Sequence, residues 1–219
     1  MKKIVFSALV LAMSLGVSAA QAQAAASGDV AAGQKKAAMC IGCHGIIGYR
    51  ASFPEVHQVP MISGQGAKYI VSALTAYQKG ERKHPTMRGI AGSLTEADMA
   101  DLAAFYESHK PAAAAVAAAP APSAQVADLL KKGNCISCHG ENLNKPIDGS
   151  YPKLAGQHAD YLLVALKSYK TENSNAVGRA NAIMGAQVKA FSNSELKALA
   201  NYIGTLPGDL TVVPNSRTR

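Results

Sequence analysis

Two nearly identical cysteine motifs constrain this chain more than any other feature. Residues 40–45 read Cys-Ile-Gly-Cys-His-Gly, and 95 residues later residues 135–140 read Cys-Ile-Ser-Cys-His-Gly. Each motif is followed by a Pro-x-x-x-Gly-Gln segment, starting at Pro60 and at Pro152, and then by a capping-box pattern. Because three motifs recur in the same order, the sequence predicts two homologous domains. Two copies are too few for a solenoid.

The boundaries of these domains follow from the positions of the motifs. We expect a first domain at residues 25–110 and a second at 123–219, joined by an Ala/Pro-rich linker at 111–122. The linker carries no charge, so it is predicted to be extended and semi-stiff. A short alanine helix across 112–119 is the alternative.

The N-terminus has the pattern of a signal peptide. Lys2 and Lys3 precede an apolar run that ends near Val17, and Ala22-Gln23-Ala24 offers a small-residue cleavage site. A membrane anchor is the alternative, but the run is short for a span of about 20 residues. We therefore expect residues 1–24 to be removed and the mature protein to be periplasmic and free of a transmembrane anchor.

Composition favours an all-α fold. Aromatic residues make up 5% of the chain, Trp is absent, and no segment alternates with a period of two for long, so essentially no sheet is expected. Each half carries three helical patterns. The middle helices repeat one apolar face, which is formed by Ile70, Ala73, Leu74 and Tyr77 and by Leu162, Ala165, Leu166 and Tyr169. The net charge of +8, about +6 without Lys2 and Lys3, comes without a Lys/Arg-rich run, so nucleic acid is not an expected partner.

The spacing C-x-x-C-H is typical of covalent haem attachment. Cys40 with Cys43, and Cys135 with Cys138, would bond the two vinyl groups of a porphyrin, while His44 and His139 would be proximal iron ligands. A redox dithiol would need a βαβ fold, which the pattern lacks, and a zinc ion shared by the four cysteines would need both halves around one metal. The sequence therefore predicts two covalently bound haem c groups.

Met87 and Met184 are the candidates for the second axial ligand of each iron. They follow His44 and His139 by 43 and 45 residues, and each stands eight residues before the final helix cap, in a predicted loop. His57, His84 and Met61 are rival ligands in the first half, but neither histidine has a counterpart in the second half, so each is expected to be an exposed or loop histidine. Met39, Met61 and Met99 are interpreted as packing residues, and His109 and His158 as surface residues. A backbone carbonyl near Pro60 or Pro152 is the expected acceptor for the other ring N–H of each ligand histidine.

These motifs resemble those of class I cytochromes c, and their tandem arrangement is similar to the dihaem cytochrome c-four family over nearly all of the mature chain. The resemblance implies two all-α haem domains of about three main helices each, with the haem propionates near their interface. It also implies His/Met ligation of both irons and periplasmic electron transfer to terminal oxidases. In such proteins a glycine of the N-terminal helix lets the last helix cross closely. Gly33 stands there in the first half and Asp128 in the second, and the segment 46–59 departs from the usual Gly/Asn-rich loop.

With His and Met both bound, an iron has no vacant coordination position for oxygen or peroxide chemistry. We therefore expect an electron carrier with no catalytic residue, not an enzyme. It would pass electrons, for example, from a quinol-oxidising complex to a terminal oxidase through weak, transient docking. The alternatives are the haem subunit of a periplasmic dehydrogenase and a dihaem peroxidase.

Overall fold

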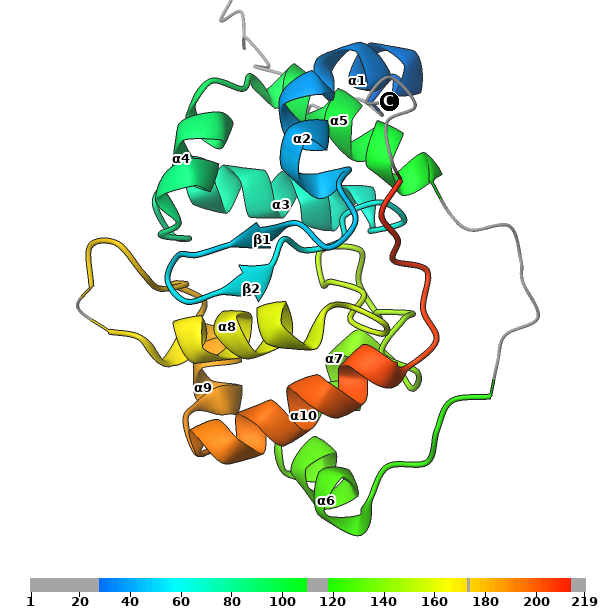
Figure 1. Cartoon of the computed structure of the whole chain (residues 1–219), viewed down its shortest axis with the longest axis vertical. Coiled ribbons are helices and arrows are strands. Elements are labelled where there is room, and N and C mark those ends of the chain that lie inside the picture. The colour runs from blue at the N-terminus through cyan, green and yellow to red at the C-terminus, as the bar shows by residue number, and fades with distance from the viewer. Residues whose placement is uncertain (1–27, 110–117, 173, 214–219) are drawn as a thin grey trace, which may run out of the picture.

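The computed structural model describes residues 28–109, 118–172 and 174–213, which form two helical domains stacked along the long axis of the molecule (Figure 1). The predicted signal peptide, the last residue of the predicted first domain and residues 111–117 of the predicted linker lie outside the described residues. The first domain holds α1 (Val30–Lys36), α2 (Ala38–His44), α3 (Ala67–Gln78), α4 (Pro85–Gly92) and α5 (Glu96–Ser108). The second holds α6 (Ala124–Lys132), α7 (Cys135–His139), α8 (Ala159–Lys170), α9 (Ala182–Val188) and α10 (Asn193–Thr205). The all-α prediction is confirmed.

The last helix of each domain begins at its predicted capping box. In α5 the Thr95 side chain accepts from the backbone N–H of Asp98, whose carboxylate accepts from the Thr95 N–H in return. Ser192 and Glu195 make the same reciprocal pair at the start of α10. These caps satisfy backbone donors that no helical hydrogen bond reaches. Both helices bury an apolar face in their domain cores, through Leu102 and Phe105 in α5 and Leu196, Leu199 and Ile203 in α10.

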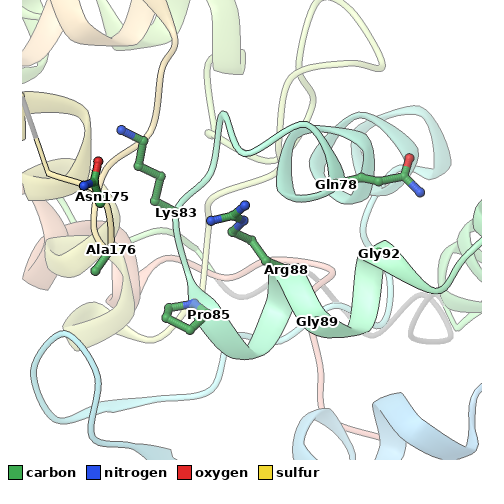
Figure 2. Close-up of a pocket in the computed structure, with 8 residues that line it drawn as sticks. All are labelled: Gln78, Lys83, Pro85, Arg88, Gly89, Gly92, Asn175 and Ala176. Atoms are coloured by element: carbon green, nitrogen blue, oxygen red, sulfur yellow. The ribbon is translucent and has the colours of Figure 1, made fainter.

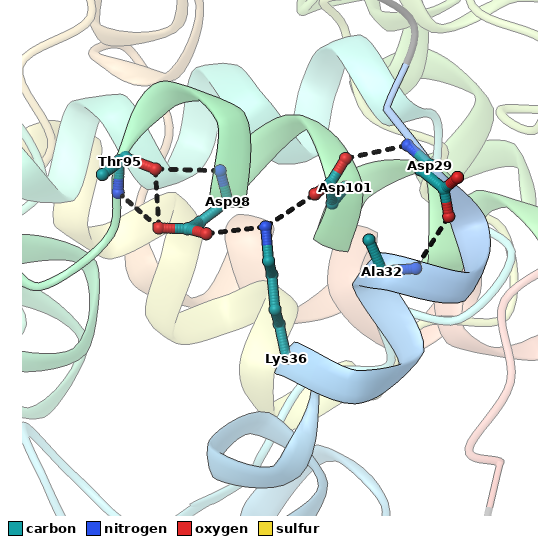
Figure 3. A network of polar contacts seen from close by, with 6 residues as sticks. All are labelled: Asp29, Ala32, Lys36, Thr95, Asp98 and Asp101. Atoms are coloured by element: carbon teal, nitrogen blue, oxygen red, sulfur yellow. Dashed lines mark hydrogen bonds and ion pairs between the residues drawn. The ribbon is translucent and has the colours of Figure 1, made fainter.

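In the first domain α1 crosses α5 at very short range. A Cβ atom on Gly33 would lie 2.1 Å from the carbonyl oxygen of Asp101, so only glycine allows this approach. Lys36 adds ion pairs of 2.7 Å to Asp98 and 2.6 Å to Asp101, as Figure 3 shows. Asp101 also accepts from the N–H of Asp29, whose side chain caps α1. The contacts expected of Gly33 are confirmed.

The second domain attaches its N-terminal helix differently. Asp128 stands where the first domain has Gly33, and it is exposed. The helix α6 packs through Val126, Leu129 and Leu130, and Lys132 pairs with Glu195 at 3.4 Å. A carboxylate at the crossing point is incompatible with the close backbone approach seen between α1 and α5. The second domain therefore packs α6 through the larger apolar side chains beside Asp128, not through a close backbone approach.

Strands β1 (Arg50–Ala51) and β2 (His57–Gln58), of two residues each, form a short antiparallel ribbon in the segment that departs from the family pattern, which agrees with the expectation of essentially no sheet. One prediction about local structure is wrong. Met87 and Met184 do not stand in loops, because each lies in the first turns of a short helix, α4 or α9. Helices of seven or eight residues show too little apolar periodicity to be recognised in the sequence.

The two domains are joined by more than the linker. The ribbon of the first domain lies against α8 of the second (Figure 1), where Asp160 accepts from the Gln58 N–H at 3.0 Å and pairs with Arg50 at 3.1 Å. After α10 the chain returns to the first domain, and the Thr211 N–H donates to the carbonyl oxygen of Ser63. Within the described ranges, no helix is both long and apolar enough to cross a membrane.

Candidate functional site

Each cysteine motif forms a short helix at the wall of a cavity. Cys40 and Cys43 lie on α2, and Cys135 and Cys138 lie on α7. None of the four side chains forms a disulfide, and all are half-buried and line the same cavity. Burial raises the pKa of the Cys40 and Cys135 thiols above its ordinary value.

The two motif histidines have the same hydrogen bond. The Nδ1 of His44 lies 2.8 Å from the Pro60 carbonyl oxygen, and the Nδ1 of His139 lies 2.9 Å from that of Pro152. A carbonyl oxygen only accepts, so Nδ1 carries the proton and Nε2 keeps its lone pair. Burial lowers the pKa of both rings and outweighs the opposing effect of the proline carbonyls. Both rings are thus neutral and oriented as metal ligands, and the predicted proline carbonyl acceptors are confirmed.

The two candidate methionines are held by equivalent caps. The Met87 N–H donates to Nδ1 of His84 at 3.5 Å, and the Met184 N–H donates to Oδ1 of Asn181 at 2.9 Å. Both methionine side chains line the cavity that the cysteine motifs line. His84 thus occupies the capping position that Asn181 has in the second domain, which gives it a structural role of its own.

One continuous cavity of about 620 Å³ receives the candidate side chains from both domains. The apolar faces predicted for the middle helices α3 and α8 point into it, which explains why these faces are not fully covered by protein. The eight predicted site residues that line it are Cys40, Cys43, His44, Met87, Cys135, Cys138, His139 and Met184. The structure therefore brings all of them together as two sets in one space.

Two of the remaining methionines and histidines, Met39 and His57, differ from their predicted places. Met99 is buried in the core as expected, whereas Met39 is exposed and is not a packing residue. His57 was predicted to be an exposed or loop histidine, but it is buried on β2 with Nδ1 against the Glu55 carbonyl oxygen. Met61 keeps its backbone engaged with Gln157 of the other domain.

The cavity fits a large, mostly apolar group attached to the thiols. The hydroxyl of Tyr106 is buried at its wall without a hydrogen-bond partner, beside Cys40. Burial and this neighbour raise the pKa of Tyr106, so the hydroxyl remains neutral. Free thiols, two oriented imidazoles and an unpaired hydroxyl around an apolar space match a covalently bound haem in each domain. The described residues hold no cluster of three or more His, Cys, Asp or Glu side chains suited to a metal ion.

The domain interface contains four residues for which the sequence predicted no role there. Gln65 and Gln157 each bond to the backbone of the opposite domain. Arg82 and Arg179 meet across the interface in an antiparallel bridge. The repeat in the sequence does relate these residues, because the members of each pair stand at equivalent positions. The two glutamines are 92 residues apart and the two arginines 97.

Comparison with known proteins gives consistent matches over both halves. The sequence pattern of the Cytochrome c family matches residues 30–110 and again 123–207. Cytochrome c4 of Azotobacter vinelandii is 32% identical over 195 residues, which cover 81% of this chain and 89% of the relative. A thiosulfate dehydrogenase electron acceptor of Stutzerimonas stutzeri (strain A1501) is 30% identical over 185 residues, covering 80% of this chain and 82% of the relative. The crystal structure of reduced recombinant cytochrome c4 from Pseudomonas stutzeri has a TM-score of 0.58 and 29% identity, and covers 82% of this chain and 99% of that chain.

Proposed function

The chain belongs to the dihaem cytochrome c4 family of the cytochromes c, and from this membership we propose that it is a periplasmic carrier of electrons between respiratory complexes. It binds two covalent haem c groups. Bound haem supplies one-electron exchange between Fe(II) and Fe(III). The ligands that the protein provides determine whether an iron also has an open position for oxygen or peroxide chemistry.

We assign the haem-binding roles residue by residue. Cys40 and Cys43 would hold the first haem through thioether bonds, and Cys135 and Cys138 would hold the second. His44 and His139 would present Nε2 to the irons, because Nδ1–H is fixed on a proline carbonyl. Met87 and Met184 would supply the thioether ligands.

The observation that carries this proposal is the equivalence of the two methionine helices. In both domains a side-chain cap fixes the N–H of the methionine, and the methionine side chain enters the haem cavity. A ligand held on a capped helix needs little rearrangement when the iron changes oxidation state. With a methionine at each iron, neither has an open position for peroxide, which argues against the dihaem peroxidase.

Electron delivery tests the carrier function. We expect ascorbate to reduce both haems, because a thioether ligand favours Fe(II). The reduced protein should then pass electrons to a terminal oxidase, at rates that fall as ionic strength rises, because its net positive charge steers docking. Rapid peroxide reduction, or no transfer to any oxidase, would contradict it.

A second candidate is the haem subunit of a periplasmic dehydrogenase. The similarity to a thiosulfate dehydrogenase electron acceptor favours this reading, and it requires the same ligands. Gentle affinity purification from the native periplasm distinguishes a dehydrogenase subunit from a free carrier. A stoichiometric larger partner, retained on size exclusion, supports the subunit, and a protein that elutes alone supports the free carrier.

Export is tested at the N-terminus. We propose that residues 1–24 are removed, so the purified native protein should begin near Ala25 and be recovered without detergent. An intact Met1, or recovery only in detergent, would replace the free carrier with a membrane-tethered one.

A further inference from the structure

Two arginines meet where the domains face each other. Arg82 lies between α3 and α4, and Arg179 lies at the equivalent place between α8 and α9. Their backbones pair as an antiparallel bridge. The Lys83 N–H donates to Gly178 at 2.9 Å and the Ala180 N–H donates to Glu81 at 2.7 Å. The local symmetry axis of the two domains therefore passes between the two arginines.

Tyrosines from both domains surround these guanidinium groups. Arg82 donates to the hydroxyl of Tyr69 at 3.1 Å, and Arg179 donates to that of Tyr161 at 3.1 Å. Each guanidinium also lies over two rings, with its Cζ between 5.3 and 5.6 Å from their centroids. The second ring is Tyr77 for Arg82 and Tyr169 for Arg179. These contacts fix the orientation of both side chains.

The fields of the two arginines overlap. Burial raises the pKa of Tyr69, but Arg82 and then Arg179 lower it, and the two charges bring it below its ordinary value. One hydroxyl of the first domain is thus influenced by an arginine from each domain. Any group that enters the same space experiences both charges.

The positive charges lack an anion within the protein. Among the described residues, no carboxylate forms an ion pair with Arg82 or Arg179, although six such pairs occur elsewhere. Both arginines are half-buried, and placing two like charges together where water is partly excluded is costly unless an opposite charge joins them. Both arginines line the haem cavity, so the missing anion is expected there.

The haem supplies suitable anions. Its vinyl groups, which the cysteines would bond, carry no charge, and its charged substituents are two propionate carboxylates. Guanidinium groups bind carboxylates through two parallel N–H donors, a geometry that an ammonium group cannot match. We propose that Arg82 and Arg179 form one shared site for the propionates of both haems, so that each arginine raises the reduction potential of both irons.

The physical consequence is a link between the two redox steps. A positive charge near an iron stabilises the form with one more electron, so it raises the potential. If each arginine served only the haem of its own domain, its loss would alter one step. At a shared site, the loss of either arginine alters both.

The test is a redox titration of the holoprotein followed by visible spectra. Arg82→Gln should lower the ratio of reduced to oxidised haem in both steps by about tenfold at a fixed solution potential, which is about 59 mV for one electron. Arg179→Gln should do the same. A shift confined to one step, in either variant, would overturn the shared site.

A matched control is available on the neighbouring helix. Arg88 is exposed on α4 and lines a separate surface pocket with Lys83 and Gln78, as Figure 2 shows. Arg88→Gln removes the same charge from the same segment and should leave both steps nearly unchanged. If it shifts them as much as Arg82→Gln does, the effect comes from net charge and the proposal is wrong.

Further measurements distinguish the loss of the arginine charge from a loss of haem or of the folded structure. Pyridine haemochrome analysis should give two haems in every variant, and the methionine charge-transfer band should persist. Arg82→Lys keeps the charge without the planar fork, so it should retain most of the native potential even if Arg82→Gln is too unstable to purify. If Arg82→Lys falls as far as Arg82→Gln, or if a lost methionine band accompanies the shift, the arginine does not act by charge on the propionates.

Discussion

The side chain of Gln65 pairs with the backbone of Lys153 through both of its amide atoms. Nε2 donates to the Lys153 carbonyl oxygen and Oε1 accepts from the Lys153 N–H, each at 3.0 Å. Gln157 repeats this pairing with Met61 in the opposite direction, at 2.9 and 3.0 Å. Each domain thus inserts a glutamine into the loop that carries the proline acceptor of the other domain. The loop whose proline carbonyl orients each ligand histidine is therefore part of the domain interface.

Gln65→Ala should loosen this interface. It removes both hydrogen bonds to Lys153 and a third that Oε1 accepts from the Gly66 N–H, and it leaves the Lys153 N–H and C=O without these partners, at a cost of roughly 2–4 kcal/mol. We expect a lower midpoint in urea unfolding followed by far-UV circular dichroism. Gln34→Ala, at an exposed position of α1, is the control and should change stability little. Equal midpoints for the two variants would show that the glutamine pairing does not hold the domains together.

Gly33→Ala should test the crossing of α1 and α5. The added Cβ would meet the Asp101 carbonyl oxygen at 2.1 Å, and backbone cannot give way as a flexible side chain can. We expect a loss of roughly 1–3 kcal/mol in the free energy of unfolding. Gly89→Ala, on α4 with no atom within 4 Å of the added Cβ, should be neutral or slightly stabilising. Destabilisation of both variants to the same extent would point to a general effect of alanine, not to the crossing.

The first domain should lose stability in acid through Asp98 and Asp101. Hydrogen bonds from Lys36 lower the pKa of both carboxyls below its ordinary value. A folded-state pKa below the unfolded one stabilises the fold above about pH 4, and this stabilisation is lost as pH falls through the folded-state value. Lys36→Met should therefore flatten the pH dependence of unfolding between pH 4 and 2. Lys35→Met, at an exposed neighbour on α1, should leave that slope intact.

Met184→Ala should affect one redox step. Removing the thioether opens the sixth position of the second iron, so one potential should fall and about half of the methionine charge-transfer band should disappear. Met99→Leu is a control, because Met99 is buried in the core and does not line the cavity. If Met184→Ala keeps both potentials, Met184 is a packing residue.

The repeated motifs are strong predictors because they are chemically restrictive. The spacing of Cys40, Cys43 and His44 matches one prosthetic group, and the capping boxes at Thr95 and Ser192 depend on neighbouring residues alone. Features that depend on distant residues were not predictable in this way. His57 is buried because the ribbon folds against α8, which local sequence does not reveal.

The contacts across the domain interface were not predictable from the sequence for the same reason. Arg82 and Arg179, like Gln65 and Gln157, recur at equivalent positions, but periodicity says nothing about which repeated residues meet across a domain boundary. Their partners are set by how the two domains pack. The short helices of Met87 and Met184 were missed for a different reason, since their caps are a histidine and an asparagine with little apolar pattern behind them.

Carbon monoxide binding distinguishes a carrier from an enzyme, and it is measured in the visible spectrum of the reduced holoprotein before and after the gas is added at neutral pH. Met87 and Met184 are proposed to fill the sixth position of both irons, so we expect two low-spin haems and almost no carbon monoxide spectrum. Met87→Ala and Met184→Ala should each bind about one carbon monoxide per chain and serve as positive controls. Ready binding to the native protein, with a high-spin signal from either haem, would contradict the assignment of both ligands and favour an enzyme over a carrier.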